Sequence, residues 1–125
     1  MTTQNSPHPV DVDAKSMEAA AALFHSFGDA SRLVILQHLQ LGEHRVVDLT
    51  RHLGLSQSTV SKHLACLKDA GIVTVRAEGR ASMYALAHHD AMLSVFAAAE
   101  KLLALTGAEV RLCALHGAET VSRTR

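Results

Sequence analysis

Apolar residues recur every three or four positions through the first third of the chain, which is the pattern of amphipathic helices. The pattern predicts a helix over residues 13–27, ended by Gly28, and a second helix over residues 30–41, ended by Gly42. Asp29 is a suitable N-cap for the second helix, because its carboxylate can accept hydrogen bonds from the first free N–H groups. The predicted apolar faces consist of Met17, Ala20, Leu23, Phe24 and Phe27 in the first helix, and Leu33, Val34, Leu36 and Leu39 in the second.

Two shorter segments with helical periodicity meet at Gly54-Leu55. Residues 46–53 predict a third helix, and Ser56 is a suitable N-cap for a fourth. The core contacts expected from the pair are Val46, Val47, Leu49 and Leu53 on the third helix and Val60, Leu64 and Leu67 on the fourth. Two short helices joined by a tight turn are typical of the helix-turn-helix that reads DNA.

The periodicity changes over residues 72–86, where IVTV and ASMYAL have the composition and alternation of strands. The segment between them, residues 76–80, contains Gly79 and two arginines and is predicted to be the hairpin tip. A β-hairpin directly after a DNA-reading helix indicates a wing, so the fold class expected is a mainly α winged helix-turn-helix.

Residues 88–105 predict a fifth helix that is apolar on most of its surface. Such a helix at the end of a small domain needs a second surface to cover it. We therefore expect an α-helical dimer interface, in which this helix packs against its symmetry mate and against the first helix. Thr106-Gly107 ends the predicted helix.

The fourth helix carries small polar and basic side chains opposite its apolar stripe. Gln and Ser can bond base edges in the major groove, and Lys can bond phosphate. The two arginines of the hairpin tip can reach phosphate or the minor groove. A helical hairpin with an ordinary polar outer face is the alternative. The predicted DNA contacts are Ser56, Gln57, Ser58, Thr59, Ser61, Lys62, His63, Arg76 and Arg80.

The 125-residue length suits one domain, predicted at residues 13–105 between a disordered arm at 1–12 and a tail at 106–125. Net charge is zero, but residues 51–80 hold five basic and two acidic residues, and residues 1–30 hold four acidic and one basic. Positive potential therefore gathers on the DNA-reading segment. The polar N-terminus and the absence of a long apolar run predict a cytoplasmic protein without a membrane segment, in which cysteine thiols stay reduced.

Residues 23–86 resemble the ArsR/SmtB family of winged-helix repressors. The resemblance rests on LFHSFGDASRLVIL, with Ala30 where proline is common, on VVDLTRHLGLSQSTVSKHLACLKDAGIV and on EGRASMYAL. It implies a homodimer that represses an operator on double-stranded DNA and releases it when an inducer binds.

The resemblance also implies several alternative inducer sites. The cysteine pair that the family places within residues 43–49 is replaced here by Arg45 and Val47. The two ligand pairs of the last helix correspond to His88 with Asp90 and to Lys101 with Ala104, and the second pair cannot chelate. Alternatively, Asp90 stabilises the N-terminal end of that helix through the helix dipole.

A third location resembles the cadmium- and lead-sensing (CmtR-like) branch, in which cysteines of the DNA-reading helix combine with a cysteine of the tail. Cys66 and Cys113 match two of these positions, and Ala70 stands where the branch has a second helix cysteine.

The residues themselves favour the same site, because Cys66 lies off the apolar stripe of its helix and Cys113 forms a C-x-x-H with His116. We predict that Cys66, Cys113 and His116 bind Cd²⁺, Pb²⁺ or Zn²⁺, with water, Asp69 or His63 as a fourth ligand.

Other functions remain open. Cys66 and Cys113 could instead form an inducing disulfide in a redox- or persulfide-sensing repressor, or the protein could have no small-molecule input. Cys66 and His63 are also spaced as a thiol–imidazole pair, but no cleft, oxyanion donors or third orienting group accompany them. The sequence therefore does not predict an enzyme.

Overall fold

A computed structural model of the chain describes residues 13–114. It contains five helices and three short strands, in agreement with the predicted winged helix-turn-helix. The elements are α1 (Ala14–Ser26), α2 (Ala30–Leu39), β1 (His44–Arg45), α3 (Val46–Leu53), α4 (Gln57–Asp69), β2 (Val73–Glu78), β3 (Ala81–Leu86) and α5 (His89–Leu105). The predicted arm at residues 1–12 lies outside the described residues.

Each helix begins and ends within about two residues of its predicted limits, because local capping contacts hold the helix ends. The Asp13 carboxylate accepts from the Ser16 N–H at 2.8 Å, and Asp29 accepts from the N–H groups of Ser31 and Arg32 at 2.8 and 3.1 Å. Gly54 ends α3 with φ +68°, a left-handed conformation that other residues adopt at a cost.

The three strands form one antiparallel sheet in the order β1-β3-β2. The sequence did not predict β1, whose two residues pair His44 with Tyr84 and Arg45 with Met83. The predicted hairpin tip at residues 76–80 was too wide: Arg76 pairs with Met83 inside the ladder, so the turn is only Gly79-Arg80. Cross-strand pairing extended both strands beyond the part that composition alone indicates.

The core lies where α2, α3 and α4 meet the base of the wing. Phe96 of α5 joins it, with its ring centroid 5.5 Å from that of Phe27. Of the four core contacts expected on α3, only Leu49 is fully buried, and Val47 is exposed because the helix presents a single side to α2 and α4. Within residues 13–114, the fully buried apolar residues are Ile35, Leu36, Leu39, Leu49, Val60, Leu64, Leu67 and Phe96.

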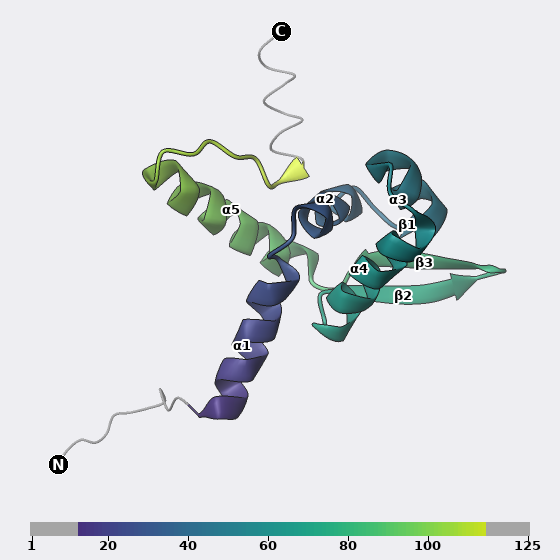
Figure 1. The fold of residues 1–125 in the computed structure, drawn as a ribbon, viewed down its shortest axis with the longest axis horizontal. Coiled ribbons are helices and arrows are strands. Elements are labelled where there is room, and N and C mark those ends of the chain that lie inside the picture. The colour runs from purple at the N-terminus through teal and green to yellow at the C-terminus, as the bar shows by residue number, and fades with distance from the viewer. Residues whose placement is uncertain (1–12, 115–125) are drawn as a thin grey trace, which may run out of the picture.

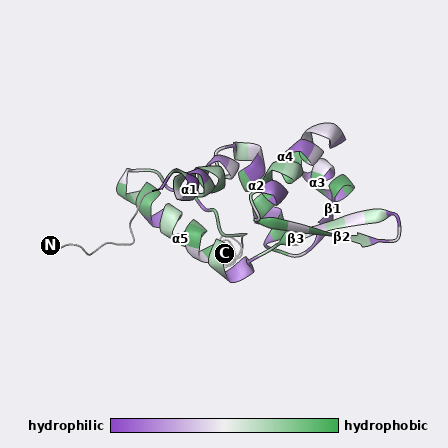
Figure 2. Ribbon diagram, turned by 90° about the horizontal axis from the view of Figure 1, so that it is seen from below, coloured by the Kyte–Doolittle hydropathy of each residue, from purple (hydrophilic) through white to green (hydrophobic). Residues whose placement is uncertain are grey.

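Figure 1 shows the helix-turn-helix and wing at one end of the molecule, α1 and α5 at the other, and α2 between them. Apolar side chains on α1 and α5 remain uncovered: Phe24 is 64% exposed, Leu102 65% and Leu105 83%. The hydropathy colouring in Figure 2 shows hydrophobic segments along both helices. Within residues 13–114, no helix combines the length and hydropathy that crossing a membrane would require.

Candidate DNA-binding surface and effector sites

The first turn of α4 is held by its own hydroxyl groups. Ser56 Oγ accepts from the Thr59 N–H at 3.2 Å and lies 2.9 Å from Thr59 Oγ1. Ser56 and Thr59, both predicted as DNA contacts, thus cap the helix. The other predicted DNA contacts on α4 that are exposed are Gln57, Ser58, Ser61 and Lys62.

His63 was also predicted to face DNA, but the structure places it half-buried against the corner between α1 and α2. Its Nδ1 is 3.4 Å from Arg32 Nη1, and its Nε2 is 3.9 Å from the Asp29 carboxylate. Arg32 also donates to the backbone carbonyls of Ser26 and His25, both at 2.8 Å. The arginine therefore fixes α1, α2 and α4 relative to one another, a role that the sequence pattern did not reveal.

The two wing arginines differ in their surroundings. Arg76 donates two hydrogen bonds of 2.8 Å to Glu43 and lies 2.6 Å from Glu78. This pairing lowers the pKa of Glu43 and raises that of Arg76, so the arginine charge is already compensated. Arg80 lies exposed at the turn, and no ion pair to it occurs within the described part of the chain. Arg80 is therefore the better placed of the two to approach phosphate.

Cys66 is a half-buried free thiol on the flank of α4, as the sequence indicated. It lines an open hollow between α4 and α1, together with Glu18, Ala21, Ala22, His25, Asp69 and Ala70. Asp69 was foreseen as a further ligand, whereas Glu18 and His25 reach this hollow only because α1 packs beside α4. The hollow thus combines a thiol with carboxylate and imidazole groups.

Cys113 is a buried free thiol on the segment that follows α5. Its Sγ contacts the Leu93 carbonyl oxygen at 3.8 Å, and its backbone N–H donates to Glu100 at 2.9 Å. Burial, followed by the nearby Glu100 carboxylate, raises the pKa of the Cys113 thiol. The protonated form is therefore favoured in this position.

Two polar side chains hold the segment that carries Cys113. Glu100 also accepts from the Leu112 N–H at 2.6 Å. The amide of Gln40, which is only 5% exposed, donates to the Leu112 carbonyl at 3.0 Å and accepts from the Ala114 N–H at 2.6 Å. Gln40 stood among apolar residues in the sequence, and that contrast could have indicated its role.

Within one chain, Cys66 and Cys113 lie in different surroundings: one faces α1 and the other packs against α5. The third predicted ligand, His116, lies outside the described residues. Of the alternative ligands on the last helix, His88, Asp90, Lys101 and Ala104 are all exposed.

The comparisons with known proteins agree with this architecture. A family model described as "Bacterial regulatory protein, arsR family" matches residues 29–75. The structure of HlyU from Vibrio cholerae is 34% identical with a TM-score of 0.59, covering 66% of this chain and 92% of that one. The chain belongs to the arsR family.

Two further relatives bear on the predicted metal sensor and on the predicted dimer. CmtR of Mycobacterium bovis is 44% identical over 69 residues, which is 55% of this chain and 58% of the relative. The chain spans about three fifths of the length of curated relatives such as this one. The homodimeric winged helix-turn-helix DNA-binding domain Mb0332 from Mycobacterium bovis is 27% identical with a TM-score of 0.61, covering 76% of this chain and 94% of that one. HlyU matches also in a reduced form, with a TM-score of 0.58.

These arsR-family relatives are transcriptional regulators rather than enzymes. The predicted family, winged helix-turn-helix fold and non-enzymatic class therefore agree with the comparisons. The metal, its ligands and the individual DNA contacts stay predictions.

The two thiols of this arsR-family chain should differ in reactivity. We expect iodoacetamide at neutral pH to alkylate Cys66 at least about tenfold faster than Cys113, because the segment around Cys113 must open before its buried, protonated sulfur can react. Peptide mass spectrometry over a time course measures both rates. Replacing Glu100 by Gln should accelerate Cys113 and leave Cys66 unchanged, and equal rates in the unaltered protein would contradict the arrangement.

Proposed function

We propose that the protein is a transcriptional repressor that binds operator DNA as a homodimer and releases it when a soft divalent metal binds at Cys66 and Cys113. The observation that carries the DNA-binding part is the exposed face of α4, with Gln57, Ser58, Ser61 and Lys62 on a well-capped helix beside a wing. Small polar side chains let a helix enter the major groove, and lysine can neutralise phosphate. DNA binding also supports the predicted cytoplasmic location.

The dimer is supported by the uncovered apolar surface. Phe24 on α1 and Leu102 and Leu105 on α5 are each more than half exposed in the single chain. Such side chains on two adjacent helices favour a symmetric interface, because each copy can cover the other. The similar domain Mb0332 is described as homodimeric. We therefore infer that α1 and α5 form the dimer interface.

The metal site combines a thiol on the DNA-reading helix with a thiol beside the inferred dimer helix. Because the two thiols have different surroundings within one chain, we propose that Cys66 of one protomer joins Cys113 of its partner, with His116 as a third ligand. Thiolates suit Cd²⁺ and Pb²⁺, and two thiolates with imidazole also suit Zn²⁺. The hollow at Cys66 adds Asp69, Glu18 and His25 as further donors. The similarity to CmtR supports this sensor class.

The proposed site explains how metal would release DNA. A metal ion joining Cys66 to Cys113 would tie α4 to the segment held by Gln40 and Glu100. The dimer would then favour a geometry in which the two α4 helices no longer match successive major grooves. A coupling free energy of about 1–3 kcal/mol would lower operator affinity about 5- to 150-fold.

Metal release can be tested on an operator selected from random DNA by the metal-free protein. Fluorescence anisotropy with Cd²⁺, Pb²⁺ and Zn²⁺ should show at least about a fivefold loss of affinity, accompanied by a thiolate charge-transfer band. Cys66→Ser and Cys113→Ser should each abolish the loss, whereas His88→Gln, at the alternative site on the last helix, should not. Full metal response in both cysteine variants would contradict the proposed ligands.

The second candidate function is a thiol-based redox or persulfide sensor. The similarity to the structure of reduced HlyU is the observation in its favour. Oxidation would join the sulfurs of Cys66 and Cys113 in a disulfide, with peroxide or polysulfide accepting the two electrons. Mass spectrometry after either treatment should then detect the Cys66–Cys113 bond, and operator release should occur without metal. Release that requires metal and proceeds with both thiols reduced would exclude this candidate.

A further inference from the structure

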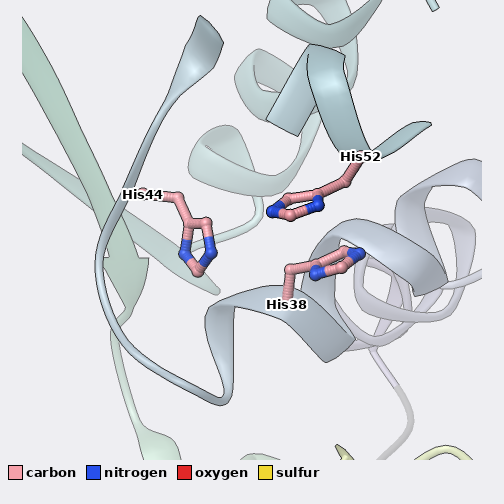
Figure 3. Close-up of side chains that lie close together, drawn as sticks. All are labelled: His38, His44 and His52. Carbon is pink, nitrogen blue, oxygen red and sulfur yellow. The ribbon is translucent and has the colours of Figure 1, made fainter. Parts of the chain in front are cut away.

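Three histidines far apart in the sequence converge at the base of the helix-turn-helix. His38 lies on α2, His44 on β1 and His52 on α3, and Figure 3 shows their rings grouped together. One ligand atom from each lies within 4.8 Å of the other two. The group is separate from the exposed face of α4 and from both cysteines.

The three rings are arranged as a compact cluster. His38 and His52 stack with centroids 4.3 Å apart and ring planes at 9°. The His44 ring stands at an angle to both, with centroids 6.1 Å from His38 and 5.9 Å from His52. His38 and His44 are half-buried and His52 is exposed, so the cluster has a fixed inner side and one side open to solvent.

A backbone contact orients His44 for metal binding. Its Nδ1 lies 2.9 Å from the carbonyl oxygen of Gly42. Because a carbonyl can only accept, Nδ1 carries the proton and Nε2 keeps a free lone pair. A hydrogen bond from one ring nitrogen to a carbonyl is the usual second contact of a metal-binding histidine, because it fixes the tautomer and the ring orientation.

Binding one ion requires side-chain rotations that bring the nitrogens closer and tilt the stacked rings of His38 and His52, because imidazole lone pairs lie in the ring plane. Two nitrogens bound to one zinc at about 2.05 Å in tetrahedral geometry lie about 3.3 Å apart. Each pair of ligand atoms, at most 4.8 Å apart now, would need to approach by about 1.5 Å or less.

We propose that His38, His44 and His52 form a metal site of three imidazoles for Zn²⁺, with the fourth position open to solvent beside His52. Imidazole suits Zn²⁺ and related divalent transition metals, whereas the soft ions favour the thiolates of the cysteine site. Cd²⁺ and Pb²⁺ would therefore favour the cysteine site, whereas Zn²⁺ suits both sites. The histidine site does not depend on the proposed inducer site.

The position of the cluster implies a stabilising role. His44 belongs to β1, which pairs with β3 of the wing, and its neighbour Glu43 is bonded to Arg76 on β2. His52 lies two residues before Gly54, where the turn into α4 begins. An ion held by all three histidines would join α2, the wing sheet and α3, the frame that orients α4. Zn²⁺ should thus raise the unfolding temperature, because it binds the folded state selectively.

The site can be tested by titrating Co²⁺, as a spectroscopic substitute for Zn²⁺, into the full chain carrying Cys66→Ser and Cys113→Ser. We expect one equivalent of Co²⁺ to give d–d absorption without a thiolate band, and Zn²⁺ to displace it. His44→Gln and His52→Gln should each weaken binding by more than the 10- to 100-fold typical of losing a second-shell partner. His89→Gln, which changes an exposed histidine of α5 outside both proposed sites, is the matched control and should bind as before.

Folding and binding can be separated in the same experiment. His52 is exposed, so His52→Gln should keep the circular dichroism spectrum and unfolding temperature of the metal-free parent. Zn²⁺ added to the unaltered chain should also shift the imidazole NMR resonances of all three histidines. Co²⁺ binding that survives His38→Gln/His44→Gln/His52→Gln, or Zn²⁺ that leaves those resonances unshifted, would overturn the site. Operator release by Cd²⁺ through the cysteines would be unaffected by that failure.

Discussion

Replacing Leu102 by Glu should abolish dimerisation and lower operator affinity by about 10²- to 10⁴-fold, the usual gain from linking two binding modules. Leu102 is 65% exposed on α5, and the neighbouring Leu105 is 83% exposed. A carboxylate there would be buried without a partner in the inferred interface, and the cost of desolvating it would favour the monomer. Each monomer would then bind only one half-site.

Leu41→Glu is the matched control for this substitution, since Leu41 is 61% exposed but follows α2 rather than lying on α1 or α5. Analytical ultracentrifugation should show dimers for the parent and for Leu41→Glu and monomers for Leu102→Glu. Circular dichroism checks that all three are folded. A dimeric Leu102→Glu protein with parental operator affinity would show that the interface lies elsewhere.

The second large effect is expected on the exposed face of α4, where Gln57→Ala/Lys62→Ala should weaken operator binding at least about 30-fold. A glutamine bonded to a base edge contributes about 1–3 kcal/mol of discrimination, and a dimer contains two copies. Lys62 is proposed to neutralise a DNA phosphate. Its loss should therefore reduce the slope of log affinity against log salt concentration by about one per protomer. Both side chains are exposed in the structure, so stability should be retained.

The single variants separate the two contributions. Gln57→Ala should relax sequence preference, whereas Lys62→Ala should weaken operator and unrelated DNA equally. Lys15→Ala, which removes an exposed lysine from α1, is the control for charge alone. Anisotropy titrations at several salt concentrations provide the affinities and the slopes. Parental affinity and slope in the double variant would mean that α4 does not enter the groove as proposed.

The sequence predicted the helices well because their capping residues act locally. Asp13, Asp29 and Ser56 each satisfy N–H groups within three residues of themselves, so the contacts need no knowledge of the rest of the fold. The apolar stripe of α4 was also correct, since Val60, Leu64 and Leu67 are all fully buried. The limits of the wing were less accurate, because pairing with β3 placed Arg76 inside the ladder.

The exposure of the predicted DNA contacts followed only in part from the sequence. Gln57, Ser58, Ser61 and Lys62 share an exposed face that helical periodicity alone defines. His63, also predicted to contact DNA, is half-buried, because Arg32 and Asp29 at the corner between α1 and α2 lie against it. Which flank of a helix another element covers depends on long-range packing, and periodicity carries no information about it.

The sequence by itself determined the winged helix-turn-helix, the exposed face of α4 and the position of Cys66 off the apolar stripe. These features follow from spacing and capping within single elements. Only the tertiary structure decided that Gln40 and Glu100 hold the segment of Cys113, and that His38, His44 and His52 meet. Each of those groups joins residues from separate elements. The sequence could not show these contacts, because core packing and the pairing of β1 with β3 decide which elements lie side by side.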